Sequence, residues 1–316
     1  MGLTLAMAGK GGVGKTTLSA LTIEWLVARG ESPVLAVDAD SNANLHEALG
    51  VAYGATVGGI REAARSEVPG LQGMAKQEFL DLRVQAALVE ETGYDLNVMG
   101  RPEGRGCYCF ANNALRDVLD RLSRQYRHIV VDSEAGLEHI SRRTLLRLDH
   151  LLIVSDASVR GVRTAKRVAD LADEVALPAG SRGLILNRVP EGGMSDALQR
   201  EVEATGLPLL ATIPLDPAIA AMDADGMTVR SLPHDAPARR ALSGLLERLY
   251  IGPSSPPSPR SAGRGNGDEV PPPRSTEGRE LAPAPLRMGG GRDEGSPIGG
   301  RCLPPGNAHT QHPEGD

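Results

Sequence analysis

The chain has 316 residues and a formal net charge of −6, and only 3% of its residues are aromatic. Three cysteines in this length exclude a small disulfide-stabilised fold, and the mildly acidic balance argues against a dedicated nucleic-acid binder. The sequence has no apolar run near the roughly 20 residues of a membrane span and no basic leader at its start. We therefore expect a globular, cytoplasmic protein with no nucleic-acid and no membrane partner.

Short apolar segments alternate with helical patterns over residues 1–251. The expected strands are Leu3–Ala8, Pro33–Val37, Asp95–Met99, His128–Val131, His150–Val154, Gly183–Leu186 and Leu209–Ile213. The expected helices are Thr16–Arg29, Gln77–Glu91, Ala111–Arg124, Val159–Val175, Asp196–Ala204 and Ala236–Tyr250. This pattern indicates an α/β fold with a doubly wound, mostly parallel sheet and helices on both faces. In such folds ligands bind at the carboxyl ends of the strands.

The composition changes at Gly252. Residues 252–316 contain 13 Pro and 13 Gly among 65 residues, and none of them is aromatic. Such a segment cannot bury enough apolar surface to offset the entropy cost of ordering it. We therefore expect one folded domain at residues 1–251 and a disordered tail at residues 252–316.

A glycine-rich segment follows the first expected strand and precedes the first expected helix. Residues 9–16 read Gly-Lys-Gly-Gly-Val-Gly-Lys-Thr, which fits the phosphate-loop pattern G-x-x-x-x-G-K-[ST]. Its glycines let backbone N–H groups surround phosphate oxygens, while Lys15 can reach the β- and γ-phosphates and the Thr16 hydroxyl can bind Mg²⁺. A glycine-rich turn without a ligand is the alternative. We expect the nucleotide to contact Gly9, Gly11, Gly12, Val13, Gly14, Lys15, Thr16 and Thr17.

Acidic residues end two of the expected strands. Asp38 and Asp40 close the second strand, and Asp132 follows the apolar run Ile129–Val131. Carboxylates at the carboxyl end of a strand can bind the Mg²⁺ shell or orient water beside a phosphate loop, although Asp is also common as a turn cap. The second segment looks like a Walker B strand followed by a switch. We expect Asp132 to hold Mg²⁺ through water and Gly136 to offer its N–H group to the γ-phosphate.

Cys107 and Cys109 form a closely spaced pair in a segment rich in Gly and charged residues, which predicts an exposed loop. Two thiolates cannot complete a four-coordinate site for a soft metal ion, and no His lies within 15 residues of the pair. A two-fold dimer would double the two ligands to four. The pair therefore indicates either a Ni²⁺ or Zn²⁺ site shared across a dimer or two reduced thiols packed in the core.

Lys10 is an addition that a plain phosphate loop does not need. The run from Lys10 to Thr17 resembles the deviant phosphate loop (deviant Walker A) of the ATPase class that contains MinD, ParA, arsenite-pump and nitrogenase iron-protein relatives. In that class the early lysine reaches across a nucleotide-sandwich dimer to the partner's phosphates. The resemblance therefore implies a homodimer and a catalytic role for Lys10 beside Lys15. It also implies that Asp40 positions the attacking water and that Asp38 supports the metal site.

The ends of two later strands complete the implied nucleotide site. Asn187 follows the strand Gly183–Leu186, and Pro214 follows the strand Leu209–Ile213. In the resembled class these positions hold the adenine, and an Asn amide offers both a donor and an acceptor to a base edge. Turn chemistry explains the two residues equally well.

Two further segments narrow the resemblance. Residues 100–109 end in Cys-Tyr-Cys, and residues 132–139 read Asp-Ser-Glu-Ala-Gly-Leu-Glu-His. Together with the deviant loop they look like the CooC-type accessory ATPases, which mature nickel-dependent carbon monoxide dehydrogenases. The resemblance spans residue 3 to about residue 250, and the Pro/Gly-rich tail departs from it. It implies an ATP- and Mg²⁺-dependent metallochaperone that dimerises with nucleotide and delivers nickel to carbon monoxide dehydrogenase.

Two other functions compete with this reading. A MinD-like positioning ATPase would carry a basic amphipathic C-terminal helix for membranes, and a ParA-like one would carry a basic face for DNA. Residues 1–251 instead have 27 basic and 32 acidic residues. An electron carrier like the nitrogenase iron protein shares a cluster between cysteines of two separate loops, whereas Cys107 and Cys109 belong to one loop.

Overall fold

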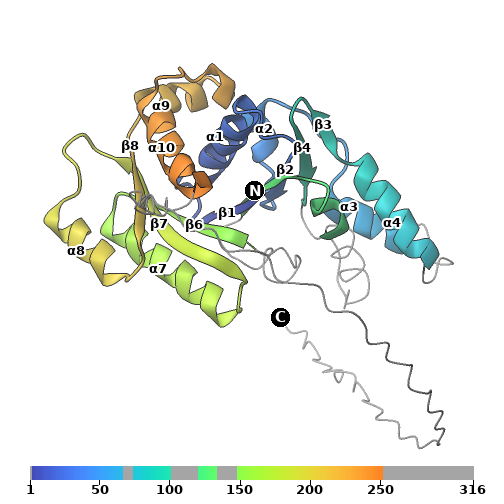
Figure 1. Ribbon diagram of the computed structural model, residues 1–316, viewed down its shortest axis with the longest axis horizontal. Coiled ribbons are helices and arrows are strands. Elements are labelled where there is room, and N and C mark those ends of the chain that lie inside the picture. The colour runs from blue at the N-terminus through green and yellow to red at the C-terminus, as the bar shows by residue number, and fades with distance from the viewer. Residues whose placement is uncertain (1, 67–73, 101–119, 134–147, 252–316) are drawn as a thin grey trace, which may run out of the picture. The chain divides into compact units, whose positions relative to one another are not determined.

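One mixed sheet runs through the structure, a computed structural model that describes residues 2–66, 74–100, 120–133 and 148–251 (Figure 1). Its eight strands have the order β3-β4-β2-β5-β1-β6-β7-β8, and every neighbouring pair is parallel except β3 with β4. The strands are β1 (Leu3–Gly9), β2 (Val34–Ala39), β3 (Val89–Glu91), β4 (Tyr94–Val98), β5 (His128–Ser133), β6 (Leu148–Asp156), β7 (Ala179–Val189) and β8 (Leu209–Pro214). This topology confirms the expected doubly wound, mostly parallel α/β fold.

Helices cover both faces of the sheet. Within the described ranges they are α1 (Lys15–Ala28), α2 (Leu45–Leu49), α3 (Val57–Ser66), α4 (Met74–Ala86), α7 (Val159–Glu174), α8 (Asp196–Ala204), α9 (Pro217–Ala224) and α10 (Pro237–Ile251), with the short 3₁₀ helix η1 (Val229–Ser231). Buried side chains of α1, α2, α9 and α10 pack on one face of the sheet. Those of α3, α4, α7 and α8 pack on the other.

The central strand β1 shows why the apolar runs in the sequence are continuous. Leu5 and Met7 belong to the core that α1 and α10 share, whereas Ala6 and Ala8 belong to the core that includes α7. All four side chains are fully buried, and successive residues of a strand point to opposite faces. A strand covered on both faces therefore needs apolar residues at every position.

The segment between α4 and β4 differs from the sequence prediction. The helix expected at Gln77–Glu91 ends at Ala86, and its last residues form β3 instead. Thr92 and Gly93 then link β3 to β4 as a tight antiparallel hairpin, with a φ of +92° at Gly93. Glycine adopts this conformation without steric cost, so strand pairing at the edge of the sheet outweighs the helical pattern here.

The other predicted elements lie close to their observed bounds. The helix Asp196–Ala204 is observed as predicted, whereas β6 and β7 extend beyond the apolar segments that predict them. The sequence pattern does not predict α2, α3 and α9, because helices of 5, 10 and 8 residues show too few turns for a clear period. Most of the helix expected at Ala111–Arg124 lies outside the described residues. The part that is described, residues 120–124, is helical at 120–123.

The carboxyl ends of β1, β2 and β5 meet at one edge of the sheet. Asp132 on β5 is in register with Met7 on β1 and with Asp38 on β2. Along the sheet, the connection from β1 to β2 runs toward the edge strand β3, whereas the connection from β6 to β7 runs toward the opposite edge strand β8. Folds of this kind bind ligands where the direction changes, and the glycine-rich loop directly follows β1.

Candidate nucleotide-binding site

The glycine-rich loop between β1 and α1 has a backbone conformation that side chains disfavour. Gly9, Gly12 and Gly14 have φ values of +146°, +79° and +93°. A side chain at Gly9 would collide with the Val154 carbonyl oxygen, and a Cβ at Gly14 would lie 2.5 Å from the Asn187 amide nitrogen. No side chain caps the first turn of α1, so its backbone N–H groups face the site and suit an anion such as a phosphate.

Lys15 and the two threonines after it open α1 at a cavity of about 700 Å³, which we call the nucleotide cavity. Lys15 is buried, and its ammonium group donates a hydrogen bond of 3.2 Å to the carbonyl oxygen of Lys10. Thr16 and Thr17 also line the cavity, while the Lys10 residue is exposed. The hydrogen bond from Lys15 to the Lys10 carbonyl therefore joins the two ends of the glycine-rich loop, while the Lys10 side chain lies at the surface.

Asp132 presents a buried carboxylate to the first turns of α1. Its Oδ1 accepts a hydrogen bond of 3.3 Å from the Ser19 hydroxyl, while its Oδ2 is buried with no hydrogen-bond partner in the described structure. Burial raises the pKa of Asp132 to about 7; the Thr16 side chain opposes this rise, and the neighbouring Asp38 reinforces it. A buried carboxylate oxygen without a partner, close to a threonine hydroxyl, suits a hard cation such as Mg²⁺.

Asp38 shapes the loop after β2, and Asp40 faces the nucleotide cavity. The Asp38 carboxylate is fully buried and accepts backbone N–H bonds from Asp40 at 3.1 Å and Leu45 at 2.9 Å. Burial raises the pKa of Asp38 to about 6 despite these two bonds. Asp40 lines the cavity, and its own carboxylate accepts an N–H bond of 2.8 Å from Asn42. Asp40 therefore both caps the turn after β2 and lines the nucleotide cavity.

Asn187 and Pro214 line a smaller cavity of about 270 Å³ that also includes Gly14 and Thr17. The Asn187 amide nitrogen donates a hydrogen bond of 2.8 Å to the Val13 carbonyl oxygen, and its amide oxygen accepts one of 2.9 Å from the next backbone N–H. The structure therefore places both residues beside the first turn of α1. In this arrangement the Asn187 side chain holds the glycine-rich loop in position through its hydrogen bond to Val13.

Arg188 is a site residue that the sequence interpretation missed. It lines both cavities, and its guanidinium donates a hydrogen bond of 3.0 Å to the Gly12 carbonyl oxygen. Its φ of +57° is uncommon for a residue with a side chain. The signal available in the sequence was a cation two residues after a predicted strand, at the edge of the sheet where ligands bind.

Three of the predicted site residues, Cys107, Cys109 and Gly136, lie outside the described residues, as does the tail predicted at residues 252–316. Within the described ranges, no group of three or more His, Cys, Asp and Glu side chains is placed to hold a metal ion. The same ranges contain no helix with the length and apolar character to cross a membrane. The cysteine metal site therefore stays a prediction.

Comparisons of sequence agree with this geometry. The family model described as the CobQ/CobB/MinD/ParA nucleotide binding domain matches residues 4–229. An uncharacterized ATP-binding protein of Methanocaldococcus jannaschii is 40% identical over 253 residues, which cover 78% of this chain and 98% of that protein. The carbon monoxide dehydrogenase accessory protein CooC of Rhodospirillum rubrum is 30% identical over 267 residues, which cover 78% of this chain and 97% of that protein.

Comparison of structures supports the same fold. The cell division ATPase MinD of Pyrococcus furiosus matches with a TM-score of 0.59 and 23% identity, over 79% of this chain and 99% of that one. A chain of the MinC:MinD cell division protein complex of Aquifex aeolicus matches with the same TM-score and identity, over 82% of this chain and 98% of that one. At 23% identity these two matches show a shared fold only.

Proposed function

Because the chain belongs to the CobQ/CobB/MinD/ParA family of nucleotide-binding domains, we propose that it is a Mg²⁺-dependent ATPase that hydrolyses ATP to ADP and phosphate. The observation that carries this proposal is the uncapped, glycine-rich start of α1 facing the partly unpartnered carboxylate of Asp132. The first feature suits phosphates and the second suits a cation. Release of phosphate from ATP with Mg²⁺, and its loss when the metal is chelated, tests this activity.

Each residue has a distinct role in the proposed reaction. Lys15 exchanges its bond to the Lys10 carbonyl for the β- and γ-phosphate oxygens. Thr16 and Asp132 would hold Mg²⁺, which would neutralise charge on the phosphates. Asp40 orients a water molecule, whose oxygen bonds to the γ-phosphorus as the bond to ADP breaks. The smaller cavity, lined by Asn187 and Pro214, accepts the adenine.

Lys10 supports the second part of the proposal, which is nucleotide-dependent dimerisation. Its side chain lies at the surface, while in the proposed reaction Lys15 serves the phosphates of its own subunit. We propose that Lys10 reaches the phosphates bound by a second copy of the chain. Light scattering of Asp40→Ala protein should show a dimer with ATP and a weaker response when Lys10→Ala is added. A monomer with and without ATP would contradict this.

The third part of the proposal is metal delivery. The similarity to a carbon monoxide dehydrogenase accessory protein and the Cys-Tyr-Cys segment at residues 107–109 support it. We propose that Cys107 and Cys109 of two chains bind one Ni²⁺ or Zn²⁺ ion as thiolates. Nickel then passes to a nickel-dependent carbon monoxide dehydrogenase when nucleotide rearranges the dimer.

A positioning ATPase of the MinD or ParA kind is the competing function, because the same family model and fold support it. Metal titration distinguishes the two. The metallochaperone should saturate at half an equivalent of Ni²⁺ per chain, with thiolate-to-nickel absorption, and the Cys107→Ser/Cys109→Ser protein should lose this site. A positioning ATPase should show no difference between the two proteins.

A further inference from the structure

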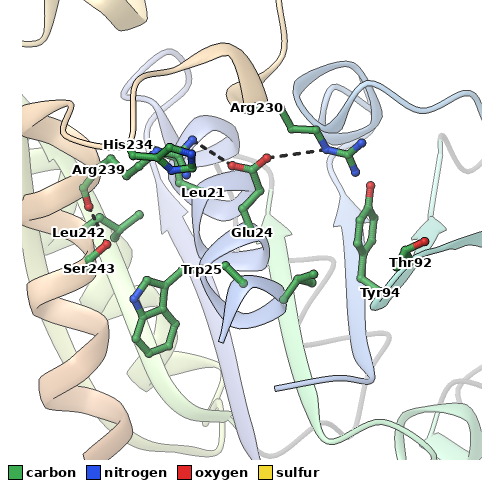
Figure 2. A pocket seen from close by; sticks show the side chains of 12 residues that line it. Leu21, Glu24, Trp25, Thr92, Tyr94, Arg230, His234, Arg239, Leu242 and Ser243 are labelled. Atoms are coloured by element: carbon green, nitrogen blue, oxygen red, sulfur yellow. Dashed lines mark hydrogen bonds and ion pairs between the residues drawn. The ribbon is translucent and has the colours of Figure 1, made fainter. Parts of the chain in front are cut away.

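A second cavity of about 620 Å³ lies between α1, α10 and the start of β4 (Figure 2). It shares no lining residue with the nucleotide cavity. We call it the α1–α10 pocket. Its apolar wall includes Leu21, Trp25 and Val27 of α1 and Leu242 of α10. A cavity of this size and character matches those that hold small organic molecules.

The charged side chains of this pocket carry a surplus of positive charge. Glu24 accepts a hydrogen bond of 3.0 Å from Arg239, which also donates one of 2.7 Å to the Val229 carbonyl oxygen. A second guanidinium, that of Arg230, lies 3.8 Å from the other Glu24 oxygen, and its side chain is 57% exposed. Arg239 is therefore fixed in place, whereas Arg230 is held loosely at the mouth of the pocket. One carboxylate faces two guanidinium groups.

Tyr94 adds a buried hydrogen-bond donor at the same place. The residue is 4% exposed, and its hydroxyl oxygen has no hydrogen-bond partner of normal geometry in the described structure. The hydroxyl points toward the guanidinium of Arg230 (Figure 2). Burial raises the pKa of Tyr94, so the group stays protonated and available as a donor. Arg230 can donate a hydrogen bond to the Tyr94 oxygen but cannot accept the Tyr94 proton, so in the described structure the O–H group has no acceptor. Buried polar groups normally have a partner.

We propose that the α1–α10 pocket binds an amphipathic carboxylate, with its apolar body against Trp25 and Leu242 and its carboxylate group between Arg230 and Tyr94. A guanidinium binds a carboxylate through two parallel hydrogen bonds, which replace its long contact with Glu24. The surplus positive charge would repel a cationic ligand, and a neutral ligand could accept hydrogen bonds but would leave that charge unbalanced. The negative Glu24 disfavours a dianion such as a phosphate monoester, because only one positive charge is in surplus.

The chain provides a direct probe, because Trp25 lines the pocket and is the single tryptophan among the 316 residues. Decanoate, a straight-chain carboxylate without absorbance of its own in this range, serves as the test ligand. Titration into the full-length protein should change the tryptophan fluorescence in a saturable way. Decanol, which has the same chain without the charge, should bind at least about tenfold more weakly, as expected for loss of a charge-assisted bond.

Variants locate the binding. Arg230→Gln should weaken decanoate binding about tenfold and Tyr94→Phe a few-fold, while Arg240→Gln, an exposed arginine of α10 outside the pocket, should leave it unchanged. Arg230→Lys keeps the charge without the paired hydrogen bonds and should give an intermediate affinity. Calorimetric titration of the same proteins checks the fluorescence. No saturable binding, or equal binding by Arg230→Gln, Arg230→Lys and wild type, would overturn the proposal.

Discussion

The nucleotide cavity and the α1–α10 pocket are built on the same helix, but they use different turns of it in opposite ways. The first turn of α1 gives Lys15, Thr16 and Thr17 to the nucleotide cavity, which is walled largely by glycines and polar side chains. The later turns give Leu21, Trp25 and other apolar residues to the α1–α10 pocket. One helix therefore offers backbone N–H groups at its start and a side-chain surface along its length.

The two cavities also differ in how the charges of their acidic groups are compensated. In the nucleotide site Asp38 and Asp132 are neighbours, and burial raises the pKa of both carboxyls. In the α1–α10 pocket Glu24 is paired with Arg239 at 3.0 Å. The nucleotide site is therefore electrostatically incomplete without a cation, while the pocket is short of one anion. Substitutions should have their largest effects where the imbalance is greater.

Loss of Lys15 should have the largest effect. Lys15→Ala removes the buried ammonium that donates to the loop and, in the proposed reaction, to the phosphates. We expect kcat/KM for ATP to fall at least about 100-fold. Lys166→Ala, which breaks an ion pair with Asp170 on α7, is the matched control and should keep wild-type turnover. Hydrolysis by Lys15→Ala within threefold of wild type would refute the assigned site.

The buried carboxylate of Asp132 should cost stability in a pH-dependent way. Its pKa is about 7 in the folded protein against 3.8 for an ordinary Asp, so the folded state binds a proton between these values that the unfolded state releases. Stability should therefore fall as pH rises through this window. Without Mg²⁺, Asp132→Asn should gain about 2 to 3 kcal/mol of stability relative to wild type between pH 5 and pH 8.

Denaturant unfolding at the two pH values measures this difference. Asp235→Asn, at an exposed residue outside both cavities, should follow wild type at each pH. A gap between Asp132→Asn and wild type that does not change with pH would show that the carboxylate is already compensated in the empty site.

A smaller effect is expected at Arg188, which contacts the loop and not the reacting atoms. Arg188→Gln removes the hydrogen bond to the Gly12 carbonyl and should weaken nucleotide binding about fivefold, the effect of losing one ordinary hydrogen bond. Fluorescent ADP displacement measures the affinity, with Arg160→Gln on the exposed side of α7 as the control. An unchanged affinity would mean that the Asn187 hydrogen bond alone is enough to hold the loop in its binding conformation.

The smallest predicted effect links the two cavities. The segment before α10 contributes Gly226, Met227 and Thr228 to the nucleotide cavity and Arg230 to the α1–α10 pocket. Saturating decanoate should therefore change the affinity for ADP by about two- to fivefold, and ADP should change the affinity for decanoate by the same factor. Equal ADP affinities with the pocket filled and empty would show that the two cavities act independently.

The same contrast explains what the sequence could and could not predict. The phosphate loop is a run of consecutive residues, and Asp38, Asp40 and Asp132 lie within one residue of the end of a strand, so local patterns locate them. The α1–α10 pocket joins Glu24 to Arg239, which lie 215 residues apart. No local pattern connects such residues. Only the packing of α10 on α1 brings them together.

The fold shows a similar division. Continuous apolar strands between helices predict the parallel sheet, because burial on both faces forces apolar residues at each position of strands such as β1. The edge strand β3 was missed, because its three residues, two of them exposed, follow a helix without a break in composition. Arg188 was missed for a different reason, since its positive φ and its bond to Gly12 are properties of the folded loop.

Asp40→Ala protein provides the most direct test of the central claim, that this site hydrolyses ATP with Mg²⁺ and a water oriented by Asp40. ATP binding and single-turnover phosphate release are measured on the same protein, with and without Mg²⁺, beside wild type. The account predicts ATP binding within a few-fold of wild type and phosphate release slower by at least about 100-fold. Phosphate release by Asp40→Ala at the wild-type rate would contradict it.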